Sequence, residues 1–240
     1  MLTVHHLNNS RSQRILWLLE ELEVAYQLEK YQRDPNTSLA PKALQAVHPL
    51  GRSPLLTTEH GTLAESGAIV EYLIQTQGKD SFVTPSEPAQ YQQYLFWLHF
   101  AEGSLMPPLV ATLVMNKAKE KSPKLLFPLV RKITDGIMDG YYRPNLEQSV
   151  RYVESYLATH DWFSGEGPGG ADVQMIFPLE ALLARGGGNK WAAISAYVKR
   201  VQQRPAYQRP WRRAGLTISP EFRRLIIVID GAFQITPNHL

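Results

Sequence analysis

Three short polar segments near the N-terminus carry side chains that could bind an anionic ligand. The first, residues 8–12 (NNSRS), leaves a strand-like run and opens a helix-like one. A helix N-terminus presents unpaired N–H groups and partial positive charge, so the hydroxyl of Ser10 and the guanidinium of Arg11 favour an anion there. The same spacing is also typical of a simple capping serine, either Ser10 or Ser12.

The second segment, residues 48–54 (HPLGRSP), comes directly before a strand-like run. A cis bond at Pro54 would expose the backbone of Ser53 to an extended peptide ligand, whereas a trans-proline loop is the commoner arrangement. The third segment, residues 64–67 (AESG), lies where a strand runs into a helix. Its N–H groups suit a carboxylate and Glu65 suits an ammonium group, as in the end of an α-amino acid, although Ser66 could also act only as a cap.

The elements that must position these segments alternate between strand and helix over the first 80 residues. Because a helix connects the first two strands, we expect them to be parallel, and the short spacing of the last two indicates a hairpin. Loops at one edge of such a sheet generally bind ligands, so the three segments are expected to converge. The predicted strands are Leu2–His6, Val24–Tyr31, Leu55–Thr58 and Thr62–Ala64, and the predicted helices are Ser12–Leu22 and Ser66–Gln77.

The remainder of the chain shows helical periodicity after a polar linker at residues 78–88. Long helices are predicted at 91–114, which Pro107 and Pro108 should kink or split, and at 128–158; two more follow at 171–185 and 190–204. The last 25 residues differ, with the β-rich apolar run 225–229. We therefore expect an α/β domain over 1–80, an all-helical domain over 88–215, and a C-terminal extension over 216–240.

Composition excludes several classes of protein. The 240 residues contain no cysteine, so disulfides, thiolate-bound metals and a nucleophilic cysteine are excluded. No apolar run approaches the roughly 20 residues of a spanning helix, and no signal peptide is visible, which fits a cytoplasmic protein with no membrane span. The adjacent His5 and His6 should point to opposite faces of a strand, and no histidine spacing indicates a metal site.

The net charge of +3 is concentrated near the C-terminus, where residues 199–224 hold eight basic residues against Glu221 alone. Such a stretch could meet nucleic-acid phosphates. A solvated helix end is favoured, because no recognition motif accompanies the charge, and no nucleic-acid partner is expected.

Residues 10–22 (SRSQRILWLLEEL), 48–56 (HPLGRSPLL) and 63–73 (LAESGAIVEYL) together resemble the glutathione transferase family. Residues 100–109 (FAEGSLMPPL) are similar to a fungal and bacterial branch of it. The resemblance extends over about residues 1–210 in order and spacing. Three motifs in register are far more specific than any one alone.

The resemblance implies a thioredoxin-like N-terminal domain that binds glutathione, an all-α C-terminal domain that holds most of the acceptor site, and a homodimer. Ser10 matches the serine that activates the thiol, with Arg11 as a second donor near the sulfur, and Asn9 is a further glutathione-binding candidate. The remaining matches are Ser53 and Pro54 for the cysteinyl backbone, Glu65 and Ser66 for the γ-glutamyl end, and His48 and Arg52 for the glycyl carboxylate. Phe100 and Met106, on the long helix, are acceptor-site candidates.

The implied activity is transfer of glutathione to small apolar electrophiles, with reduction of organic hydroperoxides by the same thiolate as an added activity. The alternative is a non-catalytic interaction or regulatory protein that keeps the fold. The chain departs from the family pattern at Gly169, where relatives usually show Ser or Thr three residues before the aspartate that is Asp172 here. It also departs beyond Ala214, where no family counterpart is recognisable.

Overall fold

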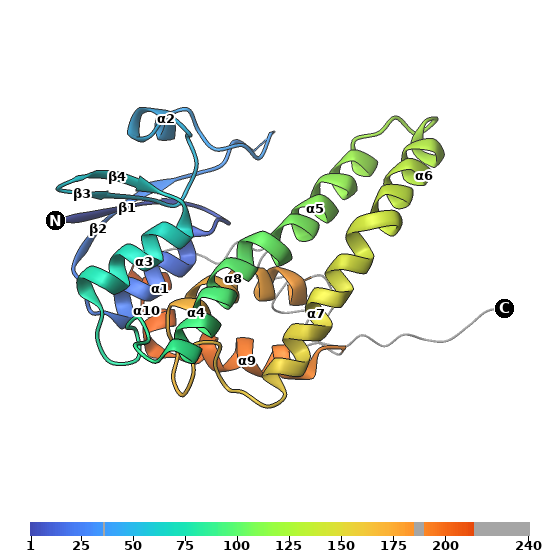
Figure 1. Cartoon of the computed structure of the whole chain (residues 1–240). Coiled ribbons are helices and arrows are strands. Elements are labelled where there is room, and N and C mark those ends of the chain that lie inside the picture. Colours follow the sequence, from blue (N-terminus) through green and yellow to red (C-terminus); the bar gives the residue numbers. More distant parts are fainter. Residues whose placement is uncertain (36, 185–189, 214–240) are drawn as a thin grey trace.

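The computed structural model describes residues 1–35, 37–184 and 190–213. The extension predicted over 216–240 therefore lies outside the described residues, as does the last residue of the helix predicted at 171–185. The described chain forms a four-stranded sheet with its helices, followed by a mostly helical remainder (Figure 1).

The sheet has the strand order β2-β1-β3-β4. Strand β1 pairs in parallel with β2 and antiparallel with β3, and β3 and β4 form a hairpin, so the predicted parallel pair and hairpin are confirmed. The strands are β1 (Leu2–Leu7), β2 (Tyr26–Tyr31), β3 (Leu55–Thr58) and β4 (Gly61–Ala64).

Helices α1 (Ser12–Glu21) and α3 (Ser66–Gln77) lie on the same side of this sheet (Figure 1). Helix α1 is buried over nearly its whole length, because it contacts the sheet on one side and the helices of the remainder on the other. The short helix α2 (Ala43–Val47) lies on the opposite side and was not predicted, since Leu44 is its one buried residue.

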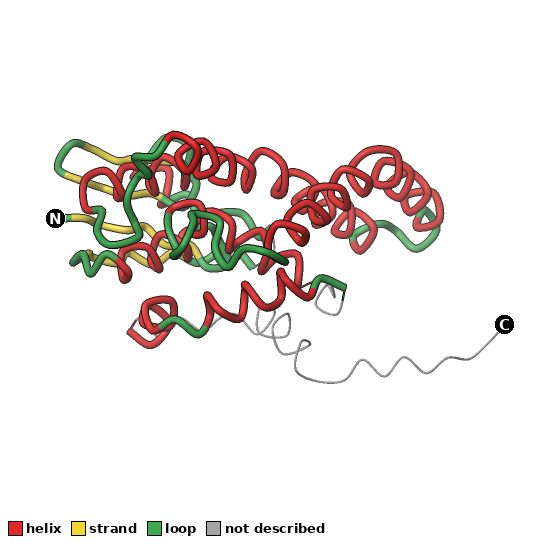
Figure 2. The backbone as a smooth tube through the Cα atoms, turned by 60° about the horizontal axis from the view of Figure 1, so that its bottom comes forward, coloured by secondary structure: helices red, strands yellow, loops and turns green. Residues whose placement is uncertain are grey.

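The remainder is built around two long helical stretches and three shorter helices (Figure 2). The first stretch comprises α4 (Pro88–Phe100), the π-helical turn η1 (Ala101–Leu105) and α5 (Met106–Glu120). The second comprises α6 (Phe127–Ile137), the π-helical turn η2 (Met138–Tyr142) and α7 (Arg143–Leu157). The shorter helices are α8 (Gly170–Leu182), α9 (Ala192–Gln202) and α10 (Pro205–Arg213).

The predicted split of the first long helix at Pro107 and Pro108 is wrong, because Pro88–Glu120 runs on as one helix. The alternative, a kink at these prolines, stays a prediction. The two prolines occupy the first turn of α5, directly after the π-helical turn. Proline has no N–H for the bond to the residue four positions earlier, and the π turn directly before it changes that backbone pairing, so proline is accommodated there. Pro144 sits in the same way at the start of α7, after the second π turn.

Gly169 is the N-cap of α8, and close packing explains why this position has no side chain. The Asp172 carboxylate accepts the backbone N–H of Gly169 at 3.0 Å and that of Phe163 at 2.9 Å, and it is fully buried. Burial raises the pKa of Asp172 to about 6. A side chain at Gly169 would place its Cβ 2.7 Å from the Cβ of Ser164, so the serine of the family pattern does not fit this backbone.

Helix α10 joins the end of the described chain to its beginning. Arg204 pairs with Glu21 at 2.5 Å and Arg209 pairs with Glu20 at 2.7 Å, and α10 packs against α1. Part of the basic stretch predicted from the sequence therefore neutralises acids of the first helix.

By length and hydropathy, Pro88–Glu120 is the one stretch of the described chain that could span a membrane, and a third of its most apolar window, 33%, is buried. Core helices of the same length meet this criterion as well. Here α4 packs against α8 inside the main hydrophobic core.

Candidate functional site

The three polar segments meet at one edge of the sheet, as predicted. In the strand register, His5 lies opposite Leu55 and Leu55 lies opposite Ala64. The end of β1, the start of β3 and the end of β4 therefore share that edge. The loops at 8–12 and 48–54 and the turn into α3 all extend from it.

Ser10 is buried, with 4% of its surface exposed, two residues before α1 begins. Its Oγ lies 2.8 Å from Ser12 Oγ and 3.3 Å from Ser53 Oγ, and it accepts the backbone N–H of Ser12 at 3.3 Å. The hydroxyls of two different loops are thus brought together at the N-terminus of one helix. The positive end of that helix stabilises negative charge.

The loop before β3 is held against β1. The Ser53–Pro54 peptide bond is cis, as the resemblance implied. The Ser53 hydroxyl donates to the His5 carbonyl at 3.0 Å and accepts the Leu7 N–H at 3.3 Å. Ser53 is therefore positioned by backbone groups of the neighbouring strand.

A cavity of about 360 Å³ opens beside these serines and is lined by three arginines. Its positive character suits carboxylates, which guanidinium groups bind through paired N–H donors. Burial, together with the charge of Arg11, lowers the pKa of Arg33. The lining residues are Leu7, Arg11, Arg33, Leu39, Ala40, Leu50, Gly51, Arg52 and Ser53.

Arg33 was missed by the sequence analysis. Its guanidinium donates to the carbonyls of Asn8 at 3.1 Å, Asn9 at 3.2 Å and Ser38 at 3.0 Å. It therefore orders the loop that carries Asn9, whose φ of 50° is a left-handed conformation that asparagine tolerates. The available signal was topological: Arg33 follows β2, which is parallel to β1, so both must end at the same edge.

Arg11 is held by the helical remainder. Glu102, in η1, pairs with Arg11 at 2.9 Å and with the fully buried Arg14 at 2.6 Å. Arg14 also donates to the backbone carbonyl of Gln174 at 2.8 Å and to its side chain at 2.5 Å. One carboxylate thus connects the cavity arginine to the contact between the sheet domain and the helices.

The turn from β4 into α3 carries the candidates for the amino acid end of the ligand. Glu65 is exposed and has a φ of 70°, a left-handed conformation that is uncommon for a residue other than glycine. Such outliers occur preferentially at functional sites. Ser66 is buried at the N-terminus of α3. Neither residue lines the arginine cavity, whose boundary lies on the other loops.

The remaining candidates divide between the cavity and the core. Arg52 lines the cavity, and His48 stabilises the same loop by accepting the Leu50 N–H on its ring at 3.3 Å. Phe100 is half-buried and packs against Phe96, with ring centroids 5.2 Å apart. Met106 is buried with 6% of its surface exposed, and neither it nor Phe100 lines the cavity.

The residues that the structure describes contain no group of three or more histidine, aspartate or glutamate side chains that could hold a metal ion. The chemistry of the edge is that of hydroxyl groups, guanidinium groups and helix N-termini. These are groups that bind and stabilise anions.

Comparison with known proteins agrees with this architecture. The family model described as "Glutathione S-transferase, N-terminal domain" matches residues 1–75. The chain is 35% identical to glutathione S-transferase 3 of Schizosaccharomyces pombe, covering 86% of this chain and 85% of that protein. It is also 35% identical to glutathione S-transferase 1 of Saccharomyces cerevisiae, covering 86% and 92%.

Among solved structures, a glutathione S-transferase from Actinobacillus pleuropneumoniae superposes with a TM-score of 0.76 at 28% identity, covering 93% of this chain and 96% of that one. The likeness therefore includes both the sheet domain and the helical remainder. With this fold and with relatives of this identity along most of its length, the chain belongs to the glutathione transferase family.

Proposed function

We propose that this protein is a glutathione transferase that activates the glutathione thiol at Ser10 for attack on small apolar electrophiles. The observation that carries the proposal is the position of the Ser10 hydroxyl. It is buried at the N-terminus of α1, and it lies 3.3 Å from Ser53, which lines the arginine cavity.

The cavity and its loops match the charges of glutathione, which carries two carboxylates and one ammonium group. Arg52 and His48 would meet the glycyl carboxylate, and Ser53 the cysteinyl backbone. Glu65 would meet the ammonium group, while Ser66 and the N-terminus of α3 would hold the neighbouring carboxylate. This assignment orients the cysteinyl sulfur toward Ser10.

The principal chemical task is to form thiolate at neutral pH. A free thiol has a pKa of about 8.5, so only a few per cent is ionised at pH 7. A hydrogen bond to a charged acceptor contributes about 1.5–3 kcal/mol, which lowers a thiol pKa by roughly one to two units. One donor from Ser10, with the α1 N-terminus, would therefore ionise about a quarter to three quarters of bound glutathione at pH 7.

In the transfer step, the thiolate sulfur forms a bond to the electrophilic carbon, and the electron pair leaves on the departing group or on the adjacent atom of an activated double bond. With a hydroperoxide, the sulfur attacks the terminal oxygen, the O–O bond breaks and the alkoxide takes up a proton. A second glutathione then reduces the sulfenic product, giving the disulfide and water. Both reactions use the same thiolate, and the acceptor-site roles of Phe100 and Met106 stay predictions.

The test is calorimetric titration of glutathione in buffers of different ionisation enthalpy, because the buffer dependence counts the protons released on binding. We expect release with the wild-type protein and less release with Ser10→Ala at nearly unchanged affinity. Ser195→Ala, which removes a hydroxyl on α9 bonded to the Trp191 carbonyl, serves as the control.

Binding without proton release in the wild-type protein would contradict thiol activation and favour the non-catalytic alternative. Absence of binding would refute a glutathione site altogether. Turnover of a chlorodinitrobenzene and of an organic hydroperoxide then distinguishes transfer from peroxidase activity.

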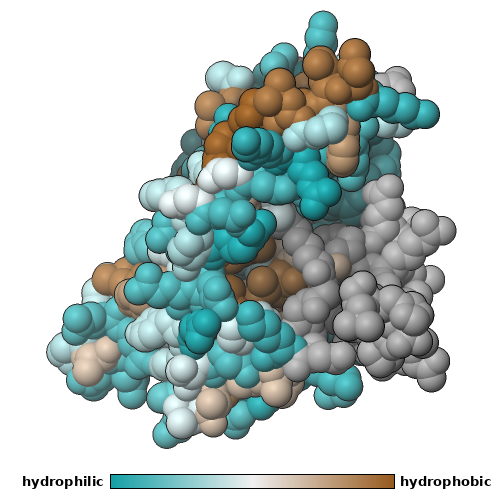
Figure 3. All heavy atoms as spheres, turned by 90° about the vertical axis from the view of Figure 1, so that its right-hand side faces the viewer, coloured by the Kyte–Doolittle hydropathy of each residue, from teal (hydrophilic) through white to brown (hydrophobic). Residues whose placement is uncertain are grey.

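We also propose that the protein is a homodimer, with contact through the helical hairpin of α5 and α6. Six large apolar side chains at helical spacing on these two helices, here called the apolar stripe, are between 41% and 58% exposed. Figure 3 shows apolar surface gathered at the outer end of this hairpin. The stripe consists of Val110, Leu113 and Val114 on α5 and Leu129, Ile133 and Ile137 on α6.

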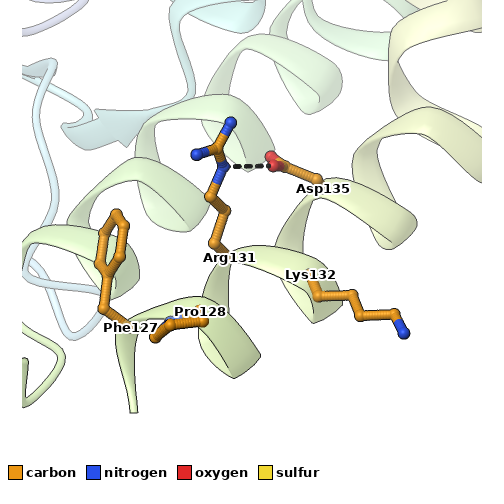
Figure 4. Close-up of a pocket in the computed structure, with 5 residues that line it drawn as sticks. All are labelled: Phe127, Pro128, Arg131, Lys132 and Asp135. Atoms are coloured by element: carbon orange, nitrogen blue, oxygen red, sulfur yellow. Dashed lines mark ion pairs between the residues drawn. The ribbon is translucent and has the colours of Figure 1, made fainter. Parts of the chain in front are cut away.

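On the other face of α6, a cavity of about 290 Å³ is lined by residues that include both signs of charge (Figure 4). Arg131 and Asp135 lie 3.4 Å apart there. The dimer proposal rests on the stripe, because an exposed apolar surface of this kind suits a contact between two copies around a two-fold axis. Sedimentation velocity should show a dimer that Ile133→Glu converts to monomer. Gln148→Glu, at an exposed position on α7, should leave the dimer intact; a wild-type monomer would refute the proposal.

A further inference from the structure

A continuous chain of hydrogen-bonding groups lies behind Ser10. From Ser10 Oγ it runs 2.8 Å to Ser12 Oγ and then 2.8 Å to Nδ1 of His6. All three residues are buried, with at most 4% of their surface exposed. The chain therefore extends inward from the hydroxyl that would face the sulfur to an imidazole in strand β1.

The direction of these hydrogen bonds decides what Ser10 can donate, because each hydroxyl carries one hydrogen. The Ser53 hydroxyl donates to the His5 carbonyl, so it does not supply a hydrogen to Ser10. For Ser10 to direct its hydrogen at a thiolate, it must be the acceptor in its contact with Ser12.

The same restriction applies one step further along. If Ser12 donates to Ser10, its hydrogen is no longer available to His6, so Nδ1 of His6 must be the donor in their 2.8 Å contact. In the opposite arrangement, Nδ1 accepts from Ser12 and Ser12 accepts from Ser10. The Ser10 hydrogen then points away from the sulfur, and turning it outward leaves two oxygens 2.8 Å apart without a hydrogen between them. The Leu7 carbonyl, 3.5 Å from Ser12 Oγ, is a third acceptor within reach of the Ser12 hydroxyl, but at that distance it competes weakly with the two 2.8 Å contacts.

Burial lowers the pKa of His6 to about 4, so at neutral pH its ring carries a single proton. That proton can reside on either nitrogen, and its position sets the direction of the whole chain. Fully connected polar networks in a buried environment polarise one another, which strengthens the terminal donor.

We propose that His6 is a positioning residue which donates its Nδ1–H to Ser12 and thereby orients the Ser10 hydroxyl toward the glutathione sulfur. The inference rests on the proposed function and deepens it. His6 does not touch the substrate; it acts through Ser12, and Ser12 acts through Ser10.

The neighbouring histidine provides a matched control. His5 points to the other face of β1, where Nδ1 lies 3.1 Å from the Tyr31 hydroxyl and Nε2 lies 3.0 Å from Thr57 Oγ1. Its contact with Ser53 uses the backbone carbonyl, which a substitution of the side chain leaves in place. His5→Asn should therefore leave the direction of the serine chain unchanged.

The test measures the pKa of the bound glutathione thiol from thiolate absorbance as a function of pH, in His6→Leu and His6→Asn. Leucine removes the donor, whereas the asparagine amide can place an N–H where Nδ1 stood. We expect His6→Leu to raise the thiol pKa by about one unit and to lower kcat at pH 6 about tenfold, with less than about a threefold change in glutathione affinity. His6→Asn should stay within about twofold of wild type, as should His5→Asn.

Ser12→Ala supplies an independent variant in case His6→Leu does not fold, and it should produce the same rise in thiol pKa. Adding His6→Leu to Ser12→Ala should raise the pKa no further, because the link is already broken. A thiol pKa unchanged in Ser12→Ala or in folded His6→Leu, while Ser10→Ala raises it, would overturn the role of His6 and leave the proposed function standing. A wild-type thiol pKa near 8.5 would refute both.

Discussion

Replacing Glu102 by glutamine should destabilise the contact between the sheet domain and the helices, because it leaves Arg14 as an uncompensated buried charge. The Arg14 side chain is fully buried, with Nη2 2.6 Å from Glu102. Burial lowers the pKa of Arg14 to about 10, and the Glu102 charge partly opposes this shift. The two hydrogen bonds to Gln174 would remain, but they carry no neutralising charge.

Removing one partner of a buried ion pair costs about 3–5 kcal/mol. The Glu102 side chain is 32% exposed, so water can partly replace it, and the glutamine oxygen can still accept a hydrogen bond. We therefore expect a loss of about 2–3 kcal/mol in the free energy of unfolding. For a chain of this size, that corresponds to a fall in Tm of about 5–10 °C.

Urea unfolding of Glu102→Gln, Arg14→Met and the double variant measures the effect. The double variant should be more stable than Glu102→Gln, because it contains no uncompensated buried charge. Glu147→Gln, which breaks exposed pairs with Arg151 and Lys190, is the control and should cost less than about 1 kcal/mol. If Glu102→Gln costs no more than this control, the buried charge of Arg14 does not depend on Glu102, and the reasoning fails.

Three further predictions concern the buried histidine, the packing of α8 and the cavity. Burial lowers the pKa of His6 to about 4, so between pH 6.5 and 4 the unfolded state binds its proton before the folded state does. On acidification from pH 6.5 to 4.5, urea titrations should show wild type losing about 2 kcal/mol more stability than His6→Asn; equal losses would contradict this. Gly170→Ala should cost about 1–3 kcal/mol, since its Cβ would lie 2.5 Å from Ile74 Cδ1. Gly136→Ala, whose added Cβ has no atom within 4 Å, should raise the free energy of unfolding by about 0.5–1 kcal/mol. Thermal unfolding that shows both glycine variants stabilised, or both destabilised, would refute the packing argument. Arg52→Gln should weaken glutathione binding about tenfold by calorimetry with an unchanged Tm; unchanged affinity would exclude Arg52 from the site.

Much of the fold could be predicted from local patterns. The helix predicted at Ser66–Gln77 has those bounds in the structure, and the hairpin follows from the spacing of two short strands around residues 59–61. The convergence of the three loops follows from topology, because parallel and antiparallel neighbours at known register must bring particular ends to the same edge. The predictions over residues 216–240 stay untested.

Sequence periodicity reflects burial and local hydrogen bonding. From it, the order of the strands and helices and the three polar segments at the edge of the sheet could be predicted. It does not report which distant side chains meet. The pairing of Arg14 with Glu102, 88 positions away, was decided by tertiary packing. The π turns before Pro107 and Pro144 were likewise not visible in the periodicity. The proposed direction of the Ser10 hydroxyl also depends on the 2.8 Å contact between Ser12 Oγ, at the start of α1, and His6 Nδ1, in β1. Only the folded chain brings these two atoms together. A buried polar group must pair with other protein groups because water cannot reach it. Which groups are buried together depends on the whole fold, so the sequence pattern alone does not show these pairs.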